Sequence, residues 1–235
     1  MHLFKKLAKA FMIILLAAVT GFALAGCGGS GASSSSAKAP AAGAAKTPAK
    51  PGDKLIIRML DIGQGDAFLL EKDGKFAMID TGDVEHREAL VKYLHEYGVK
   101  ELSNVIITHP HADHMGGMKA VFDNIKVDNI YDDGVPTNTN TYKTYLKNIK
   151  TKNIPFHIPK AGETIALFDG VDFHVAGPVS EITDQKGRPD LNNNSIVGKL
   201  TYGDFSMLFT GDAEKEEESA ILKSGFGLKL SLIHI

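Results

Sequence analysis

The chain has 235 residues, of which about 175 remain for one globular domain once its Ser/Ala/Gly/Pro-rich stretch is set aside. From Leu55 onward it carries 19 lysines and arginines against 27 aspartates and glutamates, a formal charge of −8. This balance argues against tight non-specific binding to nucleic acid, which lysine and arginine mediate, unless bound metal ions offset the charge. A solvated acidic surface explains the same charge equally well.

Residues 1–26 are typical of a bacterial secretory signal. Three lysines precede an apolar run over residues 10–25, and small residues follow up to Cys27. The run is shorter than the roughly 20 apolar residues that a membrane span needs. The stretch LAGC at 24–27 resembles the bacterial lipobox, which implies cleavage before Cys27 and a diacylglyceryl group on its thiol.

Cys27 is the only cysteine, so a disulfide within the chain is excluded. Residues 27–53 are predicted to be a lipidated cysteine followed by a flexible Ser/Ala/Gly/Pro linker. Two or more acyl chains anchor a protein stably at a bilayer. We therefore expect a lipoprotein held on the extracytoplasmic face of the cell membrane.

The domain predicted over residues 54–229 mixes short strands with helices, which favours a layered α/β (α+β) fold. The strands are rich in β-branched and aromatic residues, and the helices have apolar residues at helical spacing. The expected strands are residues 55–62, 67–71, 75–80, 104–109, 127–132, 171–177, 195–202 and 205–210. The expected helices are residues 87–98, 116–124, 139–150 and 212–225.

The stretch THPHADHMGG at 108–117 places four potential metal ligands within six positions. His109 and His111 are two apart after an apolar strand, so in extended backbone both imidazoles point to the same side. Asp113 and His114 follow where two glycines let the chain turn. Imidazole with carboxylate suits zinc, manganese or iron, and the spacing does not choose among them.

This cluster resembles the HxHxDH signature of the metallo-β-lactamase superfamily, whose fold is an αββα sandwich. The resemblance implies that His109 and His111 bind a first divalent metal ion, zinc or manganese, and that Asp113 and His114 bind a second. Asp212, in FTGD, matches the bridging aspartate of the family. Hydroxide made from water by such a metal pair would be the nucleophile, placed by Asp113 and Asp212.

Asp80, in MIDTG, matches an early aspartate that braces the metal loops of this family. Without the HxHxDH cluster, Asp80 and Asp212 would be interpreted as acidic residues that end strands.

Three further stretches resemble one branch of the superfamily, represented by the C-terminal domain of the competence protein ComEC and by phosphorylcholine esterase. They are LDIGQGD at 60–66, NNNSIV at 192–197 and LFTGD at 208–212. The branch implies cleavage of phosphate esters. It makes Asp61, Gln64, Asp66, Asn194 and Ser195 candidates for contacting substrate or orienting ligands, and glycines in the first stretch would let backbone approach the site.

Many members of the superfamily have a further metal-binding histidine between the cluster and the GD motif, where this chain offers only His157 and His174. Strand alternation places His174 opposite the apolar face, so we expect it on the surface. His157 lies between two prolines and is expected to be structural or exposed. Asn194 occupies the corresponding place in the branch, and an amide binds metal poorly, which weakens a β-lactamase interpretation.

The C-terminal residues LSLIHI at 230–235 are what CTGTCTCTTATACACATC encodes, the end sequence of a transposon used to prepare DNA for sequencing. We therefore hypothesise an adapter read-through, excluded from the fold, with His234 as no ligand. The sandwich would then be incomplete at its C-terminus, because the branch continues with a His-His-Gly-Ser motif. A genuine apolar strand is the alternative.

The favoured function is a membrane-anchored, metal-dependent hydrolase of phosphodiesters, including the nuclease activity that a ComEC-like protein implies. The acidic domain favours a small or single-stranded substrate over long duplex DNA. One alternative is a hydrolase of lactams, lactones or thioesters with the same fold. Another is a surface lipoprotein with a degenerate site that binds a ligand without turnover.

Overall fold

A computed structural model describes residues 54–234 of the chain. The predicted signal (1–26) and the lipidated Cys27 with its linker (27–53) lie outside the described residues, as does Ile235. Among the described residues, no helix is both long and apolar enough to span a membrane.

The first layer is a six-stranded sheet in the order β1-β2-β3-β5-β7-β8. Its first three strands are antiparallel, whereas β3, β5, β7 and β8 run parallel. The strands are β1 (Ile56–Met59), β2 (Phe68–Lys72), β3 (Lys75–Ile79), β5 (Asn104–Ile106), β7 (Ile130–Tyr131) and β8 (Phe156–His157). A two-stranded ribbon of β4 (Glu101–Leu102) and β6 (Lys126–Val127) lies beside it.

The second layer is a five-stranded sheet in the order β13-β12-β11-β10-β9, antiparallel except for the parallel pair β12 and β13. Its strands are β9 (Thr164–Phe168), β10 (Val171–Gly177), β11 (Val197–Tyr202), β12 (Phe205–Phe209) and β13 (Leu232–His234).

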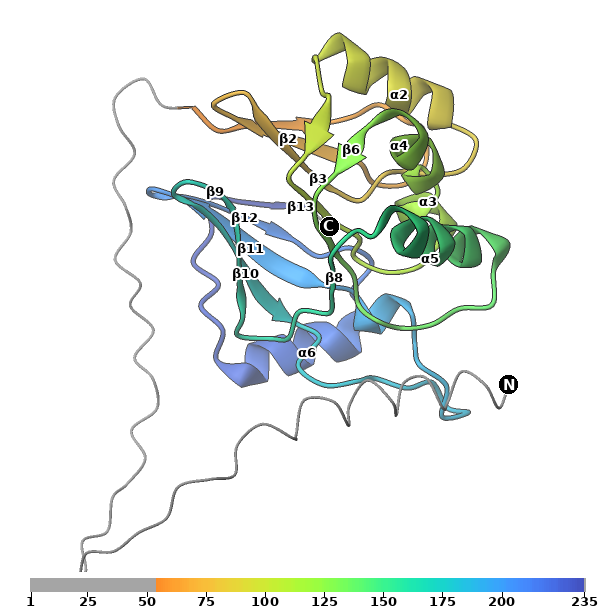
Figure 1. Cartoon of the computed structure of the whole chain (residues 1–235). Helices are drawn as coiled ribbons and strands as arrows, with labels where there is room; N and C mark the ends of the chain where they lie inside the picture. The colour runs from red at the N-terminus through yellow and green to blue at the C-terminus, as the bar shows by residue number, and fades with distance from the viewer. Residues whose placement is uncertain (1–53, 235) are drawn as a thin grey trace, which may run out of the picture. The chain divides into compact units, whose positions relative to one another are not determined.

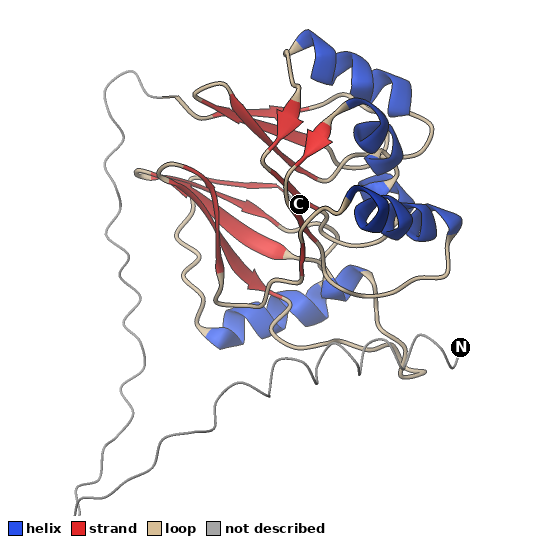
Figure 2. Cartoon of the chain, in the orientation of Figure 1, coloured by secondary structure: helices blue, strands red, loops and turns tan. Residues whose placement is uncertain are grey.

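Helices cover the outer face of each sheet, which confirms the predicted αββα sandwich (Figures 1 and 2). Four helices lie against the first sheet and α6 lies against the second. The helices are α2 (Arg87–Glu96), α3 (Ala112–Met115), α4 (Met118–Asn124), α5 (Asn140–Lys152) and α6 (Lys215–Ser224), with a 3-10 turn η1 (Asn192–Asn194).

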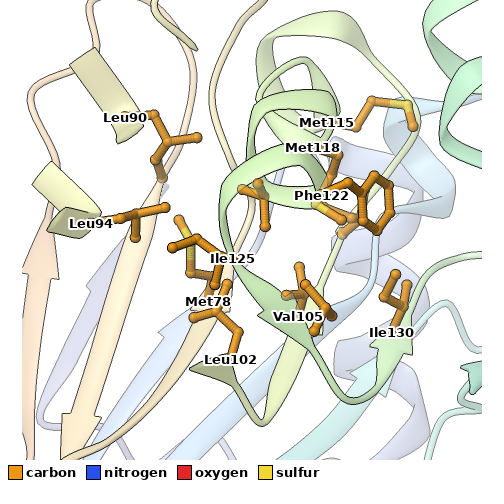
Figure 3. Close-up of a cluster of buried hydrophobic side chains, with 14 of the residues drawn as sticks. Met78, Leu90, Leu94, Leu102, Val105, Met115, Met118, Phe122, Ile125 and Ile130 are labelled. Carbon is orange, nitrogen blue, oxygen red and sulfur yellow. The ribbon is translucent and has the colours of Figure 1, made fainter. Parts of the chain in front are cut away.

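Alternation along the strands sends apolar side chains to both faces of the first sheet. Toward the second sheet, the rings of Phe68 and Phe209 meet edge-on with centroids 5.1 Å apart. Toward the helices, Met78 and Val105 pack with Leu90 and Phe122 (Figure 3). Because both faces of the first sheet are buried, its strands carry apolar residues on both faces and contain almost continuous apolar runs.

A strand or helix is present at each of the eight expected strands and four expected helices. Most elements are shorter than predicted, β10 matches its predicted bounds, and β2 and α5 end one and two residues later than predicted. The structure adds the strand β9, whose residues TIALF alternate between exposed and buried positions. It also adds short pieces, namely β4, β6, β8 and α3, which are too brief to leave a periodic pattern.

Residues 230–235 were expected to take no part in the fold, and the structure differs. Leu232–His234 pair in parallel with β12, because the apolar segment can hydrogen-bond to the open edge of that strand. The His234 ring packs edge-on against Phe68 with centroids 4.6 Å apart. The adapter origin of this segment stays a prediction.

Glu217, in the first turn of α6, is fully buried, and neither carboxylate oxygen has a hydrogen-bond partner among the described residues. Its backbone N–H donates to Asn193 Oδ1 at 3.2 Å, which connects α6 to the 3-10 turn η1. Burial, with a contribution from Asp133, raises the pKa of Glu217 to about 9. Folding therefore favours the protonated acid.

Glu217→Gln is expected to stabilise the fold at alkaline pH. The folded state holds the Glu217 proton more tightly than the unfolded state, so wild-type stability falls as pH rises from about 4.5 to about 9. A glutamine cannot ionise, so the variant should be more stable than wild type at pH 8 by about 1–3 kcal/mol. Urea unfolding at pH 5 and pH 8 measures this difference. The exposed neighbour Glu218→Gln serves as control, and equal pH dependence in all three proteins would contradict the prediction.

Candidate metal centre

The predicted metal ligands lie where strands of both sheets end. Asp80 follows β3, Thr108 and His109 follow β5, and Asp212 follows β12 of the second sheet. Because β3 and β5 are parallel, their carboxyl ends meet at the same edge. Ile196 N–H donates to Thr108 O at 2.8 Å, which joins the second sheet to this edge.

Two histidines and an aspartate form the first potential metal-binding group. One ligand atom each from His109, His111 and Asp212 lie within 4.8 Å of one another. His109 Nε2 is 3.0 Å from His111 Nδ1 and 3.6 Å from Asp212 Oδ2. The structure therefore brings together residues that are about 100 positions apart in the sequence.

Hydrogen bonds to Asp80 orient His114. Asp80 Oδ1 accepts from Thr108 N–H at 2.7 Å, and Oδ2 accepts from Thr108 Oγ1 at 2.7 Å and lies 2.9 Å from His114 Nδ1. With Nδ1 held this way, His114 Nε2 points at Asp212 Oδ1, 3.1 Å away. A carboxylate that binds the far nitrogen of a metal-ligating histidine is the usual way to orient it.

The charges of the two buried histidines differ. Burial lowers the pKa of His109, and the neighbouring His114 and His111 lower it further, to about 3. Burial also opposes a charge on His114, but the carboxylates of Asp80 and Asp212 outweigh it and raise its pKa to about 11. In the metal-free protein His109 therefore keeps a free lone pair, which is the form that binds metal.

The second potential group contains Asp66, Asp80 and His114, again with ligand atoms within 4.8 Å. Asp80 already accepts three hydrogen bonds, which suits an orienting residue better than a ligand. Asp66 has a different partner, because its Oδ2 lies 2.9 Å from His234 Nε2. Asp66 was predicted to support the ligands, but the structure places it within a potential metal-binding group. His234 lies beside this group through its contact with Asp66.

Asp113 is a member of neither group. It lies in the first turn of α3, half-exposed, with its backbone against Gly65. Gly65 has φ +100°, and a Cβ there would collide with the carbonyl oxygen of Asp113. The glycine therefore permits the close backbone approach that the sequence predicted, whereas the role of Asp113 as a ligand stays a prediction.

Asn194 and Ser195 are both buried, but only Ser195 contacts the GD motif. Asn194 Oδ1 accepts from Ile182 N–H at 3.0 Å, and its Nδ2 donates to Ile182 O and Asp190 O. These bonds direct its amide to the preceding loop. Ser195 Oγ accepts from Asp212 N–H at 3.3 Å, which fixes the backbone of that ligand.

Asp61 and Gln64 are exposed in the loop before β2, so their predicted contacts with substrate stay predictions. His174 lies on the outer face of the second sheet between the hydroxyls of Thr164 and Thr201. His157 is exposed and stacks on Tyr131 with centroids 4.9 Å apart. Neither histidine belongs to the ligand groups found among the described residues.

The acidic pair that follows β7, buried Asp132 and half-buried Asp133, was not among the predicted site residues. Asp132 is 2% exposed and accepts from Tyr145 Oη at 3.0 Å, and burial raises its pKa to about 6. Burial and the charge of Asp132 raise the pKa of Asp133 to about 8. The doublet at the end of a parallel strand was the available signal, because such ends line the same edge as the metal ligands.

A profile described as the metallo-beta-lactamase superfamily matches residues 60–231. The chain belongs to this superfamily. Among curated proteins, the ComE operon protein 3 of Bacillus subtilis is 26% identical over 199 residues, covering 76% of this chain and 25% of that protein. The competence protein ComA of Neisseria gonorrhoeae is 26% identical over 182 residues, covering 77% and 23%. The chain thus spans about a quarter of the length of these relatives.

Similarity to solved structures is found at low sequence identity. A variant of the β-hydroxylase CmlA has a TM-score of 0.50 at 14% identity, covering 78% of this chain and 35% of that one. The metallo-β-lactamase SMB-1 has a TM-score of 0.48 at 14% identity, covering 75% of both chains. At these identities the likeness concerns the fold alone.

The donor atoms of this metallo-β-lactamase-fold protein fit divalent metal ions. Two imidazoles and a carboxylate converge in the first group, and the pKa of His109 keeps its nitrogen unprotonated. Such a mixed nitrogen and oxygen set suits borderline cations such as zinc or manganese. The second group adds His114 and Asp66 to the donor set, and His114 Nε2 lies 3.1 Å from Asp212 Oδ1, consistent with a two-metal site.

Asp80→Asn is expected to weaken metal binding. The substitution keeps the side-chain shape and suits the left-handed backbone at this position, φ 55°, but it removes the charge that orients His114. Loss of such a supporting carboxylate raises metal dissociation constants about 10- to 100-fold. Zinc competition titration measures this change. Asp172→Asn, on the second sheet, is the control, and an unchanged dissociation constant in Asp80→Asn would show that Asp80 does not orient the ligand.

Proposed function

We propose that this chain is a metal-dependent hydrolase of phosphodiesters, anchored on the extracytoplasmic face of a bacterial membrane through Cys27. The observation that carries the proposal is the convergence of His109, His111, His114 and Asp212 from both sheets at one edge. A bound divalent ion supplies Lewis acidity and activates water at neutral pH.

The chain's own residues prepare the site for this chemistry. Asp80 fixes the ring of His114, and Ser195 fixes the backbone of Asp212, so the ligand atoms are positioned before metal or substrate arrives. Asp212 is 39% exposed, whereas His109 is buried, so substrate reaches the site from the side of Asp212. Asp113 and Asp212 are the residues proposed to position the attacking water.

The LDIGQGD and NNNSIV stretches support phosphodiesters over lactams as substrates, because they resemble the branch that cleaves phosphate esters. One relative is named a competence protein, ComA of Neisseria gonorrhoeae, and the branch resemblance also points to competence proteins, which makes DNA a candidate substrate. The formal charge of −8 from Leu55 onward favours a small or single-stranded substrate.

The test uses the purified full chain, supplied with manganese or zinc, on bis-p-nitrophenyl phosphate, single-stranded DNA and a chromogenic cephalosporin. Hydrolysis of a phosphodiester is expected. Asp212→Ala and Asp113→Ala should each lower the rate more than about 100-fold, because loss of a ligand exceeds loss of a supporting residue. His174→Ala, on the outer face of the second sheet, is the matched control and should retain full activity.

Other outcomes would overturn the proposal. Turnover of the cephalosporin alone would assign the chain to the lactam hydrolases. Fewer than one metal ion per chain, together with no turnover of any substrate, would indicate a ligand-binding lipoprotein instead.

A further inference from the structure

A pocket lies where α2, α4 and α5 begin, and we call it the helix-start pocket. Val84 and Arg87 line it from the start of α2, Met115 and Lys119 from α3 and α4, and Thr141 from α5. These helices follow the parallel strands β3, β5 and β7, so they start at the edge that carries the metal ligands. Met115 directly follows His114. The pocket therefore lies at the same edge of the sheet as the candidate metal centre, and Arg87, which lines it, donates to the carbonyl of Gly116, two residues after His114.

The charge of the helix-start pocket is opposite to that of the domain. Arg87 and Lys119 line it, and none of its lining residues is acidic. Arg87 Nε donates to Gly116 O at 2.6 Å, and the guanidinium has no carboxylate partner among the described residues. Lys119 pairs with Asp123 at 2.5 Å, but both side chains are 50% exposed, and such surface pairs are weak. Both cations can therefore bind an anion.

The wall formed by α5 adds neutral hydrogen-bond donors. Asn140, Thr141 and Thr144 line the pocket on this side. Thr139 caps α5 by accepting from Tyr142 N–H at 3.2 Å, which leaves the backbone N–H groups of Asn140 and Thr141 without an intrahelical partner. A pocket that contains two cations and several neutral hydrogen-bond donors, and no acidic residue, favours an oxyanion. A phosphate group has the negative charge and the acceptor oxygens that match these groups.

Apolar residues close the base of the helix-start pocket. Met115 and Met118 are each 1% exposed, and Tyr145 is 2% exposed (Figure 3 shows the two methionines). An apolar base beside cationic walls suits a phosphate that is attached to an organic group, since free phosphate has no apolar surface to bury.

We infer that the helix-start pocket binds a second phosphate group of an extended substrate, next to the phosphodiester that is cut at the metal centre. This inference rests on the proposed function and extends it. It makes Arg87 and Lys119 specificity residues that favour oligonucleotides over substrates with a single phosphate. It also reconciles an acidic domain with a polyanionic substrate, because the cations are concentrated beside the site.

The experiment compares KM for bis-p-nitrophenyl phosphate, which has one phosphate, with KM for a single-stranded oligonucleotide. Lys119→Gln and Arg87→Gln should each raise KM for the oligonucleotide about tenfold and leave KM for the small substrate unchanged. Each variant should also lower the slope of log KM against log salt by about 0.7, the value for one phosphate contact on a single strand. Lys92→Gln is the matched control, because Lys92 forms the same i,i+4 pair, with Glu96, on α2 outside the pocket.

The outcomes separate the inference from the proposed function. If wild type cleaves both substrates and the variants match Lys92→Gln, the helix-start pocket does not bind phosphate. If wild type cleaves neither substrate, the proposed function itself fails.

Where the variants show the expected effect on KM, dinucleotides with and without a 5′-phosphate identify the source of the bound phosphate group. A KM effect confined to the 5′-phosphorylated form assigns a phosphomonoester, and an effect on longer strands assigns an internal phosphate. Because Arg87 also holds Gly116, Lys119→Gln keeps the test valid if the Arg87 variant does not fold.

Discussion

The hydrogen bonds of Asp80 are the constraint on which the candidate metal centre depends. This buried carboxylate joins the ends of two parallel strands through Thr108 and directs His114 toward Asp212. A carboxylate buried to 1% exposure is costly unless it is paired, and here every oxygen has a partner. The same bonds therefore satisfy a buried charge, lock the loops together and select the ring nitrogen of His114 that faces the site.

The site also requires the two sheets to pack correctly. Asp212 belongs to the second sheet, and it reaches the histidines only because Phe68, Phe209 and their neighbours hold the sheets face to face. Gly211 lies close to Thr108 and Ser195, with no room for a Cβ, so the two layers approach closely beside the ligands. The geometry of the metal centre therefore depends on packing between the sheets. Substitutions in the inter-sheet core should disturb metal binding as well as stability.

Charge is distributed unevenly over this fold. Acidic residues dominate the domain, and burial raises the pKa values of Asp132, half-buried Asp133 and Glu217, so these carboxylates keep their protons to higher pH than ordinary ones. Arg87 and Lys119, in contrast, lie together where helices start at the carboxyl edge of the sheet. A local concentration of positive charge matters more for binding an anion than the net charge of the domain, since salt screens distant charges beyond about 8–10 Å.

Local periodicity and residues close along the chain were enough to predict most strands, the four longer helices expected, the superfamily and the ligand cluster at 108–114, although the strand β9 was missed. Resemblance to a family indicated that Asp80 and Asp212 join the cluster. Which atoms meet depends on the tertiary structure. It placed Asp66 beside the ligands, directed Asn194 to a neighbouring loop, paired Leu232–His234 with β12 and assembled the helix-start pocket from three helices. These contacts join residues far apart in the sequence, and no local pattern specifies them, since long-range packing sets their distances.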